Sequence, residues 1–289
     1  MTDTWTCREL RANDTNAIAN LLRGCPPEAR LFVRKGAPDW SVGDGWWYGA
    51  VAAGAAERGA AELGAALQVE GTTGTLIEGA PAATVALAHT LLAHQRLIGK
   101  ATGDRHVLRG LQAPMGRLWE AFQQLGRKVV ADRTRALFSA PGEAQASRLD
   151  VRAGEVGDLK LVSEFIGESV LESRGFDPRR TGRDAHERRC QNALREGRCL
   201  VARDGGAAVL VAELAALDEA TWLLEPWFVP RAFRSRKRLV AQALLPLPGL
   251  PMVAGRQLLA FAEGAELNEA FELAGWQQRA VYRVVEMQG

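Results

Sequence analysis

Residues 221–245 read TWLLEPWFVPRAFRSRKRLVAQALL, and they decide the fold of the C-terminal half of this 289-residue chain. Apolar residues on both sides of Glu225 and Pro226 are typical of a buried strand, which Pro230 ends. Because proline has no N–H for a sheet ladder, we expect a bulge or a splayed edge at Pro226. The apolar spacing of the residues that follow predicts a helix.

The turn between this strand and helix predicts an anion site. The first N–H groups of a helix have no intrahelical acceptor, and the helix dipole gives them a partial positive charge. The turn adds four cationic side chains, Arg234, Arg236, Lys237 and Arg238. An anion is therefore expected to bind at the start of the helix.

This strand and turn resemble the GNAT acetyltransferases, in which an R-G-x-G-x-G/A-type loop holds the pyrophosphate of acetyl-CoA through its backbone amides. The corresponding residues here, 234–239, read RSRKRL, so Ser235 and Lys237 stand where that family has glycine. Glycine suits such a loop because it has no Cβ to keep the backbone away from a phosphate. The resemblance implies that acetyl-CoA is a cosubstrate and that its pyrophosphate binds at Arg234, Ser235, Arg236, Lys237 and Arg238. It also implies that the pantetheine arm hydrogen-bonds to Trp227, Phe228 and Val229.

A second stretch resembles the closing helix and strand of the same family, which end in L-Y-x-x-x-G-F. Residues 265–276 read AELNEAFELAGW, so Ala270 and Phe271 take the Leu-Tyr place and Gly275 and Trp276 the Gly-Phe place. In the family this tyrosine often protonates the departing CoA thiolate. Phe271 has no hydroxyl, so the chain lacks that acid.

Two carboxylates are candidate functional groups. Glu225 lies on the strand that flanks the acetyl group in this fold, where a carboxylate could deprotonate a substrate ammonium. The alternative is an exposed glutamate beside a bulge. Glu168 resembles a glutamate that tandem GNAT proteins carry near the acceptor site, and the alternative is an ordinary solvated helix surface.

The elements expected in the N-terminal half follow the order helix, β-meander, helix, strand, helix, strand, which is close to the GNAT order. We therefore predict an α/β (α+β) fold of two GNAT-like domains, each a mixed, mostly antiparallel sheet flanked by helices. Residues 1–145 would be a degenerate copy without a recognisable cofactor loop, and residues 146–289 the acetyltransferase-like domain. The small, polar stretch 141–147, PGEAQAS, is the expected linker.

The elements expected from apolar periodicity, turn residues and helix signals can be given by number. Helices are expected at 15–22, 82–97, 114–125, 155–170 and 184–196. Strands are expected at 47–53, 64–69, 73–77, 106–110, 128–138, 149–152, 198–202, 208–214, 258–261 and 280–285. Residues 29–33 are expected to form a short strand or a turn.

Composition argues against several classes of function. The net charge is only +2, and acidic residues alternate with the arginines of 174–198, so a salt-bridged helix face is favoured over a nucleic-acid site. His89 and His94 lie five residues apart and do not share a helical face, so no metal site is expected. Four cysteines without C-x-x-C spacing, no signal pattern and no bilayer-length apolar run favour a cytoplasmic protein without a membrane segment.

Two functions from different classes remain open. The first is acyl transfer from acetyl-CoA to an amine, whose acceptor is a small molecule or a peptide. The second is a catalytically silent scaffold or acyl-CoA sensor that binds a protein partner, which the residues Ser235, Lys237 and Phe271 favour. We rank the enzyme first.

Overall fold

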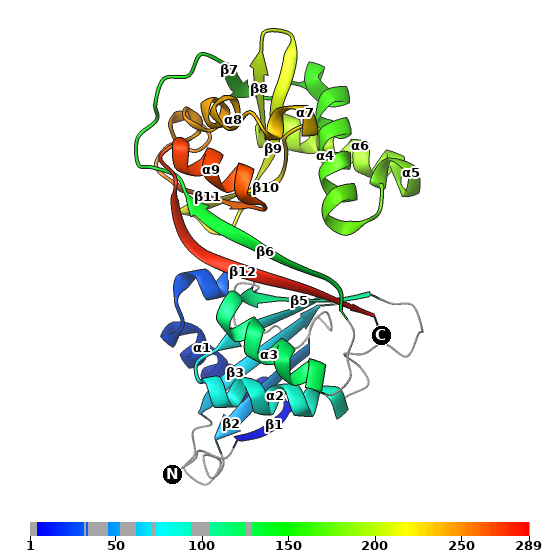
Figure 1. The fold of residues 1–289 in the computed structure, drawn as a ribbon, viewed down its shortest axis with the longest axis vertical. Coiled ribbons are helices and arrows are strands. Elements are labelled where there is room, and N and C mark those ends of the chain that lie inside the picture. Colours follow the sequence, from blue (N-terminus) through cyan, green and yellow to red (C-terminus); the bar gives the residue numbers. More distant parts are fainter. Residues whose placement is uncertain are drawn as a thin grey trace. The chain divides into compact units, whose positions relative to one another are not determined.

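The computed structural model describes residues 5–31, 33, 46–52, 62–70, 73–93, 105–124 and 129–288 (Figure 1). The expected element ends at 53, 94–97, 125 and 128, together with His94, lie outside the described residues. The chain divides into two compact units. Unit 1 contains Met1–Arg135 and Ala280–Gly289, and unit 2 contains Ala136–Arg279.

Unit 1 is a mostly antiparallel sheet covered by helices. Its strands are β1 (Trp5–Glu9), β2 (Trp46–Ala52), β3 (Leu63–Glu70), β4 (Thr73–Glu78) and β5 (Arg105–Leu111). Its helices are α1 (Thr15–Gly24), α2 (Pro81–Ala93) and α3 (Gln112–Gln124). The strands lie in chain order, and among them β4 and β5 pair in parallel. Figure 1 shows α2 and α3 lying across one face of this sheet.

Unit 2 has the same plan. Its strands are β7 (Asp150–Ala153), β8 (Cys199–Asp204), β9 (Ala207–Ala216), β10 (Thr221–Phe228) and β11 (Gln257–Ala262). Its helices are α4 (Leu159–Arg174), α5 (Pro178–Thr181), α6 (Arg183–Arg195), α7 (Arg231–Arg234), α8 (Lys237–Leu244) and α9 (Ala265–Leu273). Here β10 and β11 form the parallel pair. The expected α/β fold, a mostly antiparallel sheet flanked by helices, is confirmed.

Both faces of the unit 2 sheet are buried, as alternate residues of β8 illustrate. Leu200 and Ala202 belong to the core beneath α8 and α9, whereas Cys199 and Val201 belong to the core beneath α4 and α6. All four are fully buried. This alternation follows from the two-residue period of a strand, which points successive side chains to opposite faces.

The last strand of each sheet comes from the other half of the sequence. The end of β6 (Val129–Ser139) pairs antiparallel with β11, through residues that belong to unit 2. The end of β12 (Gln277–Gln288) pairs antiparallel with β5 in unit 1. The structural division therefore runs through β6 and β12 and differs from the sequence boundary expected at residue 145.

The segment 141–147, expected to be a linker, packs within unit 2. The N–H of Gln145 donates to the carbonyl of Leu245 (3.0 Å). Ala144 lies close to Gly249: a Cβ added to Gly249 would sit 2.6 Å from the Cβ of Ala144. The segment therefore connects β6 to β7 along the surface of one unit.

An arginine–aspartate pair starts the first helix of each unit. Arg8 donates to Asp14 through both terminal nitrogens (2.7 and 2.6 Å), and the N–H of Arg11 donates to the same carboxylate (2.8 Å). In unit 2, Arg152 donates to Asp158 (2.8 and 3.3 Å), and the N–H of Glu155 donates to it (3.0 Å). The same spacing, strand–Arg–x5–Asp–helix, recurs in both units, which indicates a repeated structural plan.

One local feature, the strand β1, was not expected. Of the two forms expected at 29–33, a short strand or a turn, the described residues show a turn. Pro27–Arg30 is a 3₁₀ turn with Pro27 at its first position, where a missing N–H costs nothing because that group has no helical partner. In the part of the chain that the structure describes, no helix is long and apolar enough to cross a membrane.

The Asp158 carboxylate should stabilise unit 2 in a pH-dependent way. Burial alone would raise its pKa, but hydrogen bonds from Arg152, the Glu155 N–H and Arg203 outweigh burial and hold the pKa at about 2. Because the folded-state pKa is below the unfolded value of about 3.9, this stabilisation is present above pH 4 and is lost as the pH falls towards 2.

We expect Asp158→Asn to lower the free energy of unfolding by about 2 kcal/mol at pH 7 and by less near pH 3, measured by urea denaturation. Asp150→Asn is the control, because that side chain is 64% exposed and lies 3.9 Å from Arg152. Equal effects of the two substitutions at pH 7 would contradict this account of the helix start.

Candidate functional site

The strand β10 separates from β11 halfway along its length. The two run in parallel register from Thr221 opposite Gln257 to Leu224 opposite Ala260, and the pairing stops there. The register of β10 with β9 shifts between Leu224 and Trp227, and the Glu225–Pro226 peptide bond is cis. The irregularity expected at Pro226 is confirmed.

The indole of Trp227 bridges the two strands where the ladder has ended. Its Nε1–H donates to the carbonyl of Phe261 on β11 (2.9 Å). Its ring lies edge-on to the ring of Phe271 on α9, with 5.6 Å between the centroids. A side chain therefore replaces the missing backbone pairing between β10 and β11.

Two backbone carbonyls in the expected arm-binding stretch, 227–229, already accept hydrogen bonds within the protein. The carbonyl of Trp227 accepts from Ser169 Oγ of α4 (2.9 Å). The carbonyl of Val229 accepts from Arg234 Nε (2.9 Å). Any ligand that pairs with this stretch would have to use its remaining backbone groups.

The turn after β10 contains two short helical segments rather than one continuous helix. The segment α7 ends at Arg234, and α8 begins at Lys237. The N–H groups of Leu239 and Val240 donate to the carbonyl of Arg236 (2.8 and 3.1 Å). The N–H groups of Lys237 and Arg238 come before them, so by position they have no intrahelical acceptor and face outward from the helix start.

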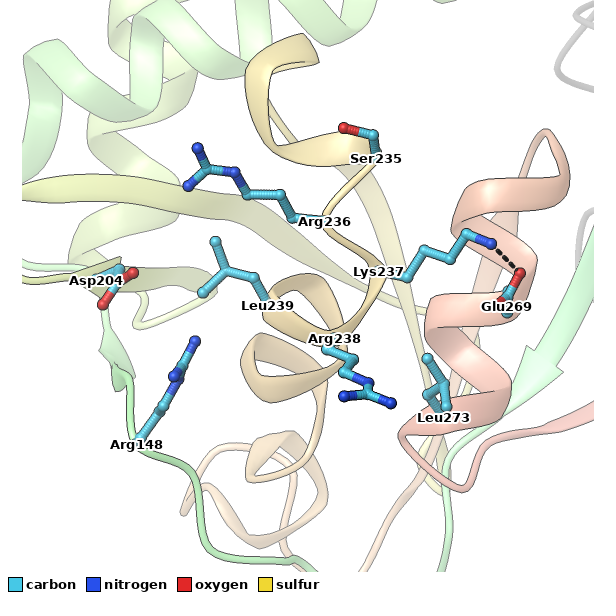
Figure 2. Close-up of a pocket in the computed structure, with 9 residues that line it drawn as sticks. All are labelled: Arg148, Asp204, Ser235, Arg236, Lys237, Arg238, Leu239, Glu269 and Leu273. Atoms are coloured by element: carbon cyan, nitrogen blue, oxygen red, sulfur yellow. Dashed lines mark hydrogen bonds and ion pairs between the residues drawn. The ribbon is translucent and has the colours of Figure 1, made fainter.

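A pocket of about 510 Å³ opens at this helix start (Figure 2). Its lining brings together the turn, the segment before β7, the end of β8 and one face of α9. The lining residues are Arg148, Asp204, Ser235, Arg236, Lys237, Arg238, Leu239, Glu269 and Leu273. Four of the five residues expected to hold a pyrophosphate thus line one pocket.

The charge in this pocket is predominantly positive. Four cationic side chains face two carboxylates, those of Asp204 and Glu269. The Lys237 ammonium forms an ion pair with Glu269, and Figure 2 shows its side chain extending from α8 towards α9. The head groups of Arg148, Arg236 and Arg238 belong to exposed residues, which leaves them able to meet an anion from solvent.

Arg148 and Glu269 were not expected in the site. Arg148 follows the stretch expected to be a linker, and its only sequence signal was its charge. Glu269 lies in the quoted stretch 265–276, and a carboxylate there had no expected role. Their place in the pocket depends on contacts between residues far apart in the sequence, which local patterns do not encode.

The structure places Arg234 outside the pocket lining. Its guanidinium donates to the carbonyl of Val229 and to Glu172 of α4 (2.6 Å), and it lies over the ring of Phe228 at 5.2 Å from the centroid. These contacts fasten the turn to α4 and to the end of β10. Arg234 thereby positions the turn through the protein's own groups.

The two candidate carboxylates lie apart from the pocket of Figure 2. Glu225 is a partly buried residue of β10, at the bulge. Glu168 on α4 forms an ion pair with Arg179 (2.6 Å), which also donates to Asp177 (2.7 Å). The hydrogen bonds with Asp177 and Glu168 raise the pKa of Arg179. Glu168 therefore ties α4 to α5.

Phe271 belongs to the core of unit 2. It is fully buried, and its ring stacks on Phe138 (5.0 Å between centroids) and meets Trp276 edge-on (4.9 Å). Thiolate chemistry at the two cysteines of unit 2 is also disfavoured, because burial raises the pKa of Cys190 to about 11 and that of Cys199 to about 12. Among the described residues, no group of His, Cys, Asp and Glu side chains suits a metal ion.

The corresponding helix start in unit 1 differs in charge. The helix α2 follows β4 and begins at Pro81, which has no N–H. The Glu78 carboxylate, 9% exposed, accepts from Thr84 of α2 and is held by Arg117 of α3 through Nε (3.0 Å) and a second nitrogen. A carboxylate of the protein itself thus lies at the start of this helix.

Solved structures of similar fold are known. A GCN5-related N-acetyltransferase from Sphaerobacter thermophilus has a TM-score of 0.60 and 14% identity, over 98% of this chain and 95% of its own. A GNAT-family acetyltransferase from Colwellia psychrerythraea has a TM-score of 0.53 and 11% identity, over 98% and 99%.

A GCN5-related glucosamine N-acetyltransferase region of a fungal multi-domain GH3 β-N-acetylglucosaminidase has a TM-score of 0.54 and 13% identity, over 99% of this chain and 38% of that one. At such identities these likenesses establish a GNAT-like fold. No protein-family model and no curated protein matches the sequence.

Arg234 and Arg231 form a matched pair for testing how the turn is held, because both donate to Glu172. Arg234 also satisfies the buried carbonyl of Val229, whereas the Arg231 side chain is 82% exposed. Arg234→Ala should therefore lower the free energy of unfolding by about 1–3 kcal/mol, and Arg231→Ala by less than about 1 kcal/mol. Urea denaturation measures both, and a larger loss for Arg231→Ala would contradict the assignment.

Proposed function

We propose that unit 2 binds acetyl-CoA and transfers its acetyl group to an amine. One observation carries the proposal: a pocket rich in cations opens at the start of α8, directly after a strand that has parted from its parallel neighbour. The GNAT-like fold supports acyl transfer as the class of reaction. The amine would be that of a small molecule or a peptide.

The helix start would hold the pyrophosphate through the N–H groups of Lys237 and Arg238, with charge supplied by Arg148 and Arg236. The side chains that replace glycine need not obstruct it. Lys237 extends to Glu269 on α9 (Figure 2), so its bulk leads away from the turn. Helix N-termini with unpaired amides bind phosphate without any side chain.

In the proposed transfer the neutral amine attacks the thioester carbonyl carbon, a C–N bond forms and the C–S bond breaks. Glu225 would accept the proton of the substrate ammonium, directly or through a water molecule. The CoA thiolate leaves with the bonding electron pair, and the second proton, which the attacking nitrogen gives up as it becomes an amide, passes to the thiolate through water, since Phe271 has none to give. Holding thioester and amine together accounts for much of the acceleration in such a reaction.

The acceptor site would lie near Glu168. An acceptor ammonium would share Glu168 with Arg179 or replace it, since Arg179 already donates to one oxygen of that carboxylate (2.6 Å). The side of Gly167 is closed to additional bulk, since a Cβ there would meet Arg179 Cδ at 2.6 Å. The Arg179 side chain thus packs over Gly167, beside the proposed acceptor site.

A second candidate function is a silent scaffold or acyl-CoA sensor that binds a protein partner. It is favoured by the fully buried Phe271 in place of an acid and by the Trp227 indole between the strands. The two candidates differ in turnover. A sensor would bind acetyl-CoA without releasing CoA in the presence of any amine.

Calorimetry with acetyl-CoA tests the phosphate site. We expect saturable binding that weakens with added salt, and a loss of about tenfold or more in Arg236→Glu/Arg238→Glu, because two anions would then face the pyrophosphate. The control is Arg188→Glu, which reverses an exposed charge on α6 outside the pocket. Unchanged affinity in the double variant would mean that the ligand binds elsewhere. No binding by the unaltered chain would exclude the enzyme and the acyl-CoA sensor and would leave the scaffold.

Glu225→Gln tests the proposed base. With an amine acceptor, the rate of CoA release, monitored with a thiol reagent, should fall by about 10²-fold or more, while the affinity for acetyl-CoA stays the same. Glu219→Gln is the matched control, because Glu219 is an exposed residue of the turn that precedes β10. A kcat that drops equally in both variants, or in neither, would remove Glu225 from the mechanism.

A further inference from the structure

The inner edge of β10 beyond Leu224 is where an extended ligand would be expected to pair with this sheet. On the opposite edge, Trp227 and Phe228 pair with Ala212 and Val211 of β9. On the inner edge the pairing with β11 has ended. An amide-containing chain adds to such an edge through backbone hydrogen bonds. A pantetheine arm, which carries two amides, is a chain of that kind.

The Trp227 indole lies in this gap and occupies a hydrogen-bond acceptor that β11 presents across it. It donates to the carbonyl of Phe261, the residue that follows the last paired position, Ala260. Removing the indole from the gap would break this hydrogen bond. It would also end the edge-on contact with Phe271.

Neighbouring residues fix the indole in place. The Trp227 carbonyl accepts from Ser169 of α4, and its backbone pairs with β9, so the Cα cannot move without disturbing two elements. Phe271, against which the ring rests, is itself packed between Phe138 and Trp276. The bridge between the strands is therefore part of a packed aromatic cluster.

We propose that Trp227 is the specificity-determining residue of this groove: it fills the gap between β10 and β11, so a pantetheine arm enters only when the indole leaves. This inference rests on the proposed phosphate site. The pocket at α8 binds the nucleotide end of the ligand at full strength, while binding of the arm is reduced by the fraction of molecules in which the gap is open.

The test compares two ligands, acetyl-CoA and 3′-phosphoadenosine 5′-diphosphate, on the full chain by calorimetry. The second keeps the pyrophosphate and lacks the arm. The unaltered chain should bind both within about threefold of each other, because the arm adds little while the gap is filled. Trp227→Ala should bind acetyl-CoA about tenfold more tightly, with no change for the diphosphate. Trp227→Phe, which retains a ring but loses the N–H donor, should fall between the two and still fold if the alanine variant does not.

Trp222→Phe is the matched control. Trp222 lies on the same strand beneath Arg256 (4.8 Å), and its buried Nε1 has no hydrogen-bond partner among the described residues. This substitution should leave both affinities unchanged.

Two results would overturn the inference. One is an unaltered chain that prefers acetyl-CoA by far more than tenfold, and the other is a Trp227→Ala or Trp227→Phe variant that binds acetyl-CoA more weakly, since the indole would then contact the arm. Failure of both ligands to bind would refute the phosphate site itself, and this inference with it.

Discussion

The parting of β10 from β11 is the constraint on which the rest of unit 2 depends. Four residue pairs hold the two strands together. A proline without an N–H and a shift of register then take β10 out of the ladder. The turn that follows places the start of α8 and its cations beside α9. The same parting opens a gap in the sheet, and the Trp227 indole restores one hydrogen bond across it. Pocket and gap are thus consequences of one break in a parallel pair.

The two units share one arrangement of helices and strands but differ in the charge at one helix start. Each has a first helix started by an arginine–aspartate pair, one parallel strand pair and a helix after the first strand of that pair. In unit 2 that helix begins among cations that line a pocket. In unit 1 it begins at Pro81, beside the partly buried Glu78 carboxylate that Arg117 holds. The helix start that we propose as an anion site in unit 2 has, in unit 1, a carboxylate of the protein beside it. The difference between the two units lies in a few residues at equivalent turns.

Local pattern predicted much of this molecule because most of its strands and helices have a clear apolar period, and because a proline in a ladder has a definite physical cost. It did not predict the origin of the last strands. Nothing local in β6 or β12 says which strand it will pair with, and only the pairing shows which strands each one joins. In the turn, four of the five expected residues came together in the pocket. The use of Arg234 as an anchor to Glu172 and the pairing of Lys237 with Glu269 depend on partners 62 and 32 residues away, which no local pattern encodes.

The central claim is that the helix start of α8 receives a phosphate through its backbone. The most direct measurement is the amide chemical shift of each residue in the ¹⁵N-labelled full chain during titration with 3′-phosphoadenosine 5′-diphosphate. We expect the amides of Lys237 and Arg238 to shift most, and their shifts to saturate together with the same dissociation constant. Shifts of comparable size that are confined to the arginines of α6, or to the start of α2 in unit 1, would contradict it.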